Sequence, residues 1–121
     1  MGYTRKGLGD RGEEAAYGFL CRLGWHIIER NYRCRMGEID IVARDGDVLV
    51  FIEVRSRSGL RLGLPEESVG FAKQKKLRLL AQQYLLARPR FTNHPCRFDV
   101  LAVMLNEQGE AKSIKHIKNA F

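Results

Sequence analysis

The sequence lacks the features that mark disulfide-rich, zinc-binding and membrane proteins. Its three cysteines, Cys21, Cys34 and Cys96, are odd in number, widely spaced and without a CxxC pair. A disulfide framework or a zinc site is therefore not expected. No apolar run approaches the roughly 18 residues of a membrane span, and no basic-then-apolar leader opens the chain. We expect a cytoplasmic protein with no membrane partner.

Internal repeats and low-complexity tracts are also absent. With 121 residues and a hydrophobic fraction of 45%, the chain is long enough to bury one core. We expect a single domain over residues 1–121. Residues 1–9 are expected to be flexible, because this glycine-rich start has no hydrophobic period.

Acidic side chains are absent from residues 68–98, and this segment carries the whole formal charge of +7. Residues 1–67 hold 11 basic and 11 acidic side chains, and residues 99–121 hold three of each. The basic side chains of the acid-free segment are Lys73, Lys75, Lys76, Arg78, Arg88, Arg90 and Arg97. Such a cluster is either a solvated helix face or an anion-binding surface, and the favoured anion would be nucleic acid.

Residues 37–57 predict a β-hairpin that carries buried acids. Apolar runs over residues 39–43 and 48–54 flank Asp45-Gly46-Asp47, which is a strong short-range hairpin signal. Glu38 and Asp40 lie in the first predicted strand and Glu53 in the second. Carboxylates among core residues require partners, so this hairpin is the candidate site.

The position of the turn decides which carboxylates meet. A turn at Gly46-Asp47 sets Asp40 opposite Glu53 and Glu38 opposite Arg55. A turn at Asp45-Gly46 sets Glu38 opposite Glu53 instead. Either register places these side chains on one face, because alternate residues of a strand share a face.

Two helices are expected to flank the sheet. The first covers residues 10–23 with Ala16, Phe19, Leu20 and Leu23 inward, and this spacing also turns Glu13 inward. Glu13 is either functional or an ordinary first-turn glutamate favoured by the helix dipole. The second helix covers residues 71–87 with Leu77, Leu80, Ala81 and Tyr84 inward. Extending this stripe backward reaches Lys73 and Lys76, where a helix N-terminus is suited to phosphate.

The remaining chain completes a mixed α/β domain. Strands are expected over residues 25–33, 97–105 and 111–117, with a loop over residues 56–70 that is long enough to cover or flank a site. The pattern leaves the face of Asp99 open. The order is one helix, three strands, one helix and two strands, with both helices packed on the sheet.

Inward carboxylates beside Arg55 have three explanations. Mg²⁺ prefers oxygen ligands and is held by one or two carboxylates with waters and substrate phosphates. A glycosidase also uses two acids, but it needs a sugar cleft and does not account for a basic surface. The third explanation is a structural network in which Arg55 neutralises Glu38 and Glu53.

Six short motifs, taken together, resemble those of a known family. They are Gly12-Glu13, Arg30-Asn31-Tyr32-Arg33, Gly37-Glu38-Ile39-Asp40, Phe51-Ile52-Glu53-Val54-Arg55, Lys73-Gln74 and Arg97-Phe98-Asp99-Val100. Over nearly its full length the chain resembles the YraN family of uncharacterised bacterial proteins. That family is similar to archaeal Holliday junction resolvases within the restriction-endonuclease-like, or PD-(D/E)xK, superfamily.

The resemblance implies an α/β, restriction-endonuclease-like single domain, with a central mixed β-sheet flanked by helices and an αβββαβ core. It implies a Mg²⁺ or Mn²⁺ ion bound by Asp40 and Glu53, with Glu13 completing or supporting that shell. Gln74 or Lys73 would orient water or phosphate, and Glu38 would support the site. The nucleic-acid backbone, DNA in preference to RNA, would be held by Lys73, Lys75, Lys76, Arg78 and Arg57.

The chain departs from the superfamily at Arg55, where a lysine is usual. A guanidinium stays charged and cannot act as a neutral base, but it can stabilise charge on phosphorus. Two functions therefore remain open: a divalent-metal-dependent endonuclease acting on DNA, branched DNA included, or a nuclease-fold protein that binds nucleic acid without cleaving it. A scaffold that uses the sheet edge is a third. By analogy with resolvases, a homodimer is expected.

Overall fold

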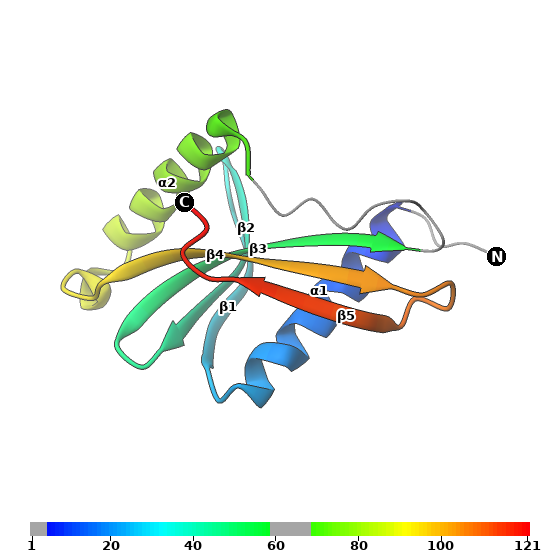
Figure 1. Ribbon diagram of the computed structural model, residues 1–121. Coiled ribbons are helices and arrows are strands. Elements are labelled where there is room, and N and C mark those ends of the chain that lie inside the picture. Colours follow the sequence, from blue (N-terminus) through cyan, green and yellow to red (C-terminus); the bar gives the residue numbers. More distant parts are fainter. Residues whose placement is uncertain (1–4, 59–68) are drawn as a thin grey trace.

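The computed structural model describes residues 5–58 and 69–121, which form two long helices, a short 3₁₀ helix and five strands (Figure 1). In chain order these elements are α1 (Arg5–Arg22), β1 (His26–Cys34), β2 (Gly37–Asp45), β3 (Val48–Ser58), α2 (Phe71–Leu86), η1 (Pro89–Phe91), β4 (Cys96–Leu105) and β5 (Ala111–Ile117). The predicted order of helices and strands is confirmed.

The strands form one mixed sheet in the order β1-β2-β3-β4-β5. β3 and β4 are parallel, and every other neighbouring pair is antiparallel. A parallel pair needs a crossover connection, and here α2 lies within the connection from β3 to β4. The expected α/β class and the restriction-endonuclease-like core are therefore confirmed.

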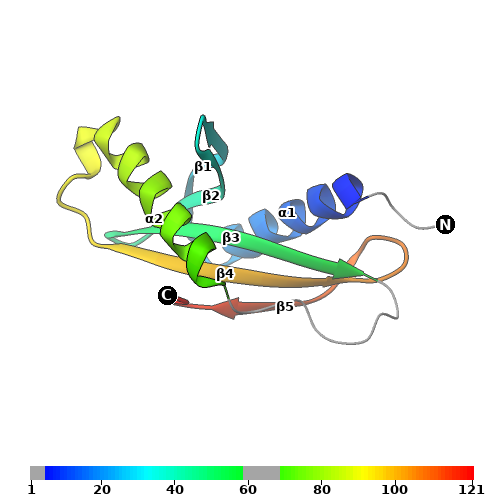
Figure 2. The same ribbon diagram turned by 90° about the horizontal axis from the view of Figure 1, so that it is seen from above.

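The two long helices pack on opposite faces of the sheet, and each face has its own core (Figures 1 and 2). The predicted inward residues Ala16 and Leu20 of α1 pack with Ile41, Val50 and Ile52. On the other face, α2 packs its predicted stripe against Val42 and Phe51. Leu23 is an exception to the predicted stripe, since it is 48% exposed, because α1 ends one residue before it.

The N-terminal helix is longer than predicted. α1 begins at Arg5, so residues 5–9 are helical, whereas the sequence favoured a flexible start. This helix is held on the sheet by packing that no local signal predicts: Gly12 lies so close to β3 that a Cβ atom there would overlap Ser56 Oγ. The expected flexibility of residues 1–4 lies outside the described residues. The loop predicted over residues 56–70 begins later, since β3 runs to Ser58, and residues 59–68 are likewise not described.

β2 and β3 separate at one end and form a fork in the sheet. Their pairing ends at Ile41 and Ile52, although β2 continues alongside β1 to Gly37 and β3 continues alongside β4 to Ser58. Figure 2 shows β1 and β2 standing away from the other three strands. At this fork, the ladder of hydrogen bonds between β2 and β3 is interrupted.

A left-handed residue in β1 accompanies this separation. Asn31 has a φ of 55°, and the β1–β2 register places it level with Asp40. Asparagine tolerates this conformation better than most residues. Near this point β2 changes face, because Ile39 and Val42 both join the core under α2. Regular alternation would have put them on opposite faces.

A buried ionic network lies on β4 and β5. The fully buried Asp99 accepts hydrogen bonds from Arg97 Nε at 2.9 Å and from the Asn119 N–H at 3.0 Å, and it lies 2.8 Å from His116 Nε2. Burial alone would raise the pKa of Asp99, but these hydrogen bonds outweigh it and hold the pKa below its ordinary value. Asp99 is paired with Ile52, whose side chain packs under α1, so Asp99 lies on the α1 face of the sheet. Because Arg97, His116 and Asn119 hold its carboxylate there, its role is structural.

We predict that Gly12→Ala lowers the free energy of unfolding by about 2 kcal/mol, because the new methyl group would lie 2.9 Å from Ser56 Cβ and force α1 away from β3. Gly9→Ala is the matched control in the same helix, since a Cβ there meets nothing within 4 Å. It should raise stability by about 0.5–1 kcal/mol through helix propensity. Denaturant unfolding measures both, and equal effects would contradict the close approach of helix and strand.

Candidate functional site

The fork brings together the two carboxylates of the predicted hairpin. The hairpin turns at Gly46-Asp47, which confirms the first of the two predicted registers, since Asp45 pairs with Val48 and Ile41 with Ile52. Extended by one residue beyond its last pair, Ile41 with Ile52, this register places Asp40 opposite Glu53. The Asp40 residue is 9% exposed and the Glu53 side chain 13%, so both acids are largely withdrawn from solvent.

The Asp40 carboxylate replaces a strand-to-strand hydrogen bond at the point where β2 separates from β3. Its Oδ2 accepts a hydrogen bond from the Val54 N–H at 2.8 Å. Burial raises the pKa of Asp40 to about 7, the Val54 hydrogen bond opposes this rise, and the neighbouring carboxylates of Glu53, Glu13 and Glu38 add to it. A carboxylic acid so disposed changes its protonation near neutral pH and favours the approach of a cation.

Two basic side chains lie close to the Glu53 carboxylate. Lys73 Nζ, on the first turn of α2, lies 3.6 Å from Glu53 Oε2, and an Arg55 Nη atom lies 3.8 Å from the same oxygen. The Lys73 side chain is 44% exposed, so it can reach a ligand in solvent. Both cations therefore lie beside one carboxylate oxygen of Glu53.

Glu13 of α1 approaches the same carboxylates from the opposite face of the sheet. Burial raises the pKa of Glu13, and the negative charge of Glu38 raises it further. The side chain thus lies near the acids, as its helical position predicted. Glu38 differs from prediction: it forms an ion pair of 2.9 Å with Arg33 of β1 rather than facing Arg55. The change of face in β2 is the reason.

The predicted residues of α2 do not all face the fork. The Gln74 side-chain amide donates a hydrogen bond to the Val69 carbonyl at 2.7 Å, so it secures the segment that enters the helix. Arg78 lies over the rings of Phe98 and Phe121, at 5.6 and 5.3 Å from their centroids. Lys75 is exposed.

Lys76 of the same helix contacts the β1–β2 turn instead. A Cβ atom at Gly37 would lie 2.9 Å from Lys76 Cε. The basic side chains of α2 are therefore distributed over several surfaces, with Lys73 closest to the carboxylates.

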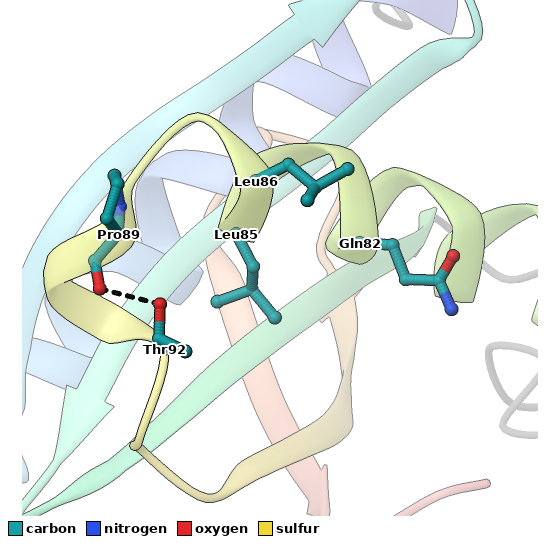
Figure 3. Close-up of a pocket in the computed structure, with 5 residues that line it drawn as sticks. All are labelled: Gln82, Leu85, Leu86, Pro89 and Thr92. Atoms are coloured by element: carbon teal, nitrogen blue, oxygen red, sulfur yellow. Dashed lines mark hydrogen bonds between the residues drawn. The ribbon is translucent and has the colours of Figure 1, made fainter.

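A polar hollow opens beside these residues. It has a volume of about 420 Å³ and is lined by Glu53, Val54, Arg55, Ser56, Arg57 and Lys73. Arg57, predicted as a phosphate contact, thus shares the hollow with the candidate catalytic groups. A second hollow of about 410 Å³ lies at the far end of α2 (Figure 3). Its lining is Gln82, Leu85, Leu86, Pro89 and Thr92, so it offers no ionisable group for chemistry.

The donor set fits a hard cation that is only partly held by protein. Within residues 5–58 and 69–121, no three histidine, cysteine, aspartate or glutamate side chains converge as a complete metal cage. Mg²⁺ commonly has one or two protein carboxylates and completes its octahedron with waters and substrate phosphates. Asp40 and Glu53 are the carboxylates that could take part in that arrangement, and Glu13 is a neighbouring charge.

The Arg30-Asn31-Tyr32-Arg33 motif has no role in the site predicted from the sequence, yet it shapes the site. Arg33 neutralises Glu38, and Arg30 lies 2.8 Å from Glu14. The available signal was Asn31, a residue that tolerates positive φ, within a run of strand-forming residues.

Comparison with known proteins identifies relatives over the whole chain. Residues 12–103 match the profile of a family described as "Uncharacterised protein family UPF0102". A UPF0102 protein of Desulforamulus reducens is 55% identical over 121 residues, which cover 99% of each chain. UPF0102 proteins of Pelotomaculum thermopropionicum and Caldicellulosiruptor saccharolyticus are 50% and 42% identical, with coverage of 100% of both chains and of 98% and 99%, respectively.

The raised pKa of Asp40 predicts a stability that depends on pH. Between the unfolded pKa of 3.8 and the folded value of about 7, the folded chain binds more protons than the unfolded chain. Stability should therefore fall as pH rises through this window and level off above it. Asp40→Asn keeps an acceptor for Val54 without the charge. It should raise the melting temperature by roughly 5 °C at about pH 8 and have less effect at about pH 4. A gain that is the same at both pH values would contradict the assignment.

Proposed function

The chain belongs to the uncharacterised protein family UPF0102, and we propose that it is a nucleic-acid-binding protein that hydrolyses phosphodiester bonds in DNA with a bound divalent cation. The observation that carries this proposal is the pair Asp40 and Glu53 at the fork, bordered by Arg55 and Lys73. Largely buried acids next to a half-buried arginine and an exposed lysine suit a ligand that is itself a cation bound to a phosphate.

Asp40 and Glu53 are the residues that would hold Mg²⁺ or Mn²⁺. When bound, such an ion neutralises charge on the phosphate and lowers the pKa of a coordinated water. The pKa of Asp40, raised to about 7 by burial and by nearby acids, makes its proton easy to displace at neutral pH. A cation would thus relieve the repulsion among the carboxylates.

Arg55 and Lys73 would bind the phosphate that is cleaved. Both lie within 4 Å of Glu53 Oε2, so a phosphate beside that carboxylate is within their reach. Arg55 remains charged and therefore stabilises charge on phosphorus rather than accepting a proton. Gln74 would act as a positioning residue. Its hydrogen bond to the Val69 carbonyl holds the first turn of α2, which carries Lys73.

A second candidate function is binding without cleavage. Arg55 supports it, because the lysine usual in this superfamily can serve as a neutral base, whereas a guanidinium cannot. In that case the same cations would hold the nucleic-acid backbone and the carboxylates would only set the position of the phosphate.

Cleavage separates the two functions. The purified protein is incubated with duplex, flapped and four-way DNA in Mn²⁺, and Glu53→Gln is compared with Glu107→Gln, an exposed glutamate in the turn between β4 and β5. We expect nicking by the wild type and by the Glu107 variant, and a loss of about 100-fold or more in Glu53→Gln, by the scale of losses when one electrostatic catalytic group is removed. If no cleavage depends on Glu53, the protein binds without cutting.

Binding is tested by removing charge from α2. The triple variant Lys73→Ala, Lys75→Ala and Lys76→Ala should weaken DNA affinity at all sequences and reduce the slope of log K against log salt by up to about 3. The control removes the same charge from β5 and its end, at Lys112, Lys115 and Lys118. Fluorescence anisotropy across a salt series measures both. An equal loss in the two variants would show that net charge, and not this surface, binds DNA.

A further inference from the structure

The β1–β2 hairpin ends in an exposed apex that the proposed chemistry does not use. The last pair of the ladder is Cys34 with Gly37, so the apex consists of Arg35 and Met36. Both residues are exposed, and Met36 is 37% exposed, although it is a large apolar residue. Figure 2 shows the β1–β2 hairpin standing away from β3, β4 and β5 at one end of the sheet.

The apex is a turn that does not require a methionine. Neither Arg35 nor Met36 has a positive φ, and the glycine that follows them, Gly37, has a φ of 143°. A turn without positive φ at its two central positions accepts most residue types. Turn geometry therefore permits Met36 without requiring it, and packing in the core does not account for it, because the residue is exposed.

The apex is held in place by α2. Tyr32, near the end of β1, packs edge-on against the buried Tyr84 with ring centroids 5.0 Å apart. Gly37 has a φ of 143° and touches Lys76 so closely that a Cβ there would lie 2.9 Å from Lys76 Cε. The base of the apex is thus fixed on a packed helix, so an inserted side chain would meet a ligand without first becoming ordered.

Cations surround the exposed methionine. Arg35 is its neighbour at the apex, Lys76 lies against Gly37, and the Arg33 side chain is 74% exposed, although it is paired with Glu38. Met36 precedes Asp40 by four positions, a span of about 13 Å at about 3.3 Å per residue of extended chain. Along one DNA strand this distance corresponds to about four base steps.

We propose that Met36 is a wedge that enters the base stack of DNA held in the fork, about four steps from the phosphate at Asp40, while Arg35 and Lys76 contact the flanking phosphates. Proteins that open a base step commonly insert methionine or another apolar side chain between bases and hold the backbone with basic residues. The proposal rests on the proposed function, which it deepens. It assigns as substrate DNA with a base step that is already opened, such as a branch point, because unstacking costs least there.

The test uses Met36→Ser and Met36→Phe. Serine suits a turn and removes the apolar group, whereas phenylalanine keeps it. Leu86→Ser is the matched control, since Leu86 is 80% exposed at the far end of α2. Binding is measured by anisotropy on duplex and four-way DNA in Ca²⁺. Unstacking is measured by the fluorescence of 2-aminopurine placed in turn at successive positions of the four-way DNA.

We expect the wild type to bind four-way DNA more tightly than duplex and to brighten 2-aminopurine at one step near the branch. Met36→Ser should lose that brightening and about tenfold in affinity for four-way DNA, with duplex binding unchanged. Met36→Phe and Leu86→Ser should retain both properties.

Two failures are distinguishable. If the wild type binds DNA through Lys73, Lys75 and Lys76 but Met36→Ser keeps the brightening and the preference for four-way DNA, the wedge is wrong and the proposed function stands. If the wild type binds neither DNA, both proposals fall together.

Discussion

The hydrogen bond from the Val54 N–H to the Asp40 carboxylate is the interaction on which the site depends. It takes the place of a strand-to-strand bond at the point where β2 leaves β3. A backbone N–H left without an acceptor at this depth would be costly, so the carboxylate permits the strands to separate. Asp40 and Glu53 lie at the gap that results.

The same arrangement has a cost in stability that a ligand could relieve. Burial and three neighbouring acids raise the pKa of Asp40 to about 7, so its charge is opposed in the protein without a cation. The buried Asp99 shows the contrast, because Arg97, His116 and a backbone N–H keep its charge favourable. The protein favours the charge of Asp99 and opposes that of Asp40, and a carboxylate whose pKa is strongly raised is a candidate for a functional role.

The two helices place the remaining charges around the gap. Gly12 lets α1 lie against Ser56, and the next residue, Glu13, then reaches the acids from one face. On the other face Gln74 anchors the start of α2, which sets Lys73 beside Glu53. Within the described residues no helix is both long and apolar enough to span a membrane. Among the described cations of the acid-free segment, Lys73 lies beside the carboxylates of the fork, whereas Arg78 covers aromatic rings and Arg97 pairs with Asp99.

By itself the sequence determined the order of elements, the two core stripes and the hairpin that carries Asp40 and Glu53, because these follow from local periodicity and turn chemistry. The mixed sheet followed from the resemblance to a known family, and the register of the hairpin was decided by the tertiary structure. The tertiary structure decided where β2 leaves β3, which pairs Glu38 with Arg33 instead of Arg55, and that Arg78 covers aromatic rings. It also decided that residues 5–9 are helical. Periodicity assumes an unbroken strand, whereas the left-handed Asn31 and the carboxylate of Asp40 interrupt the pattern through contacts between strands that no local signal contains.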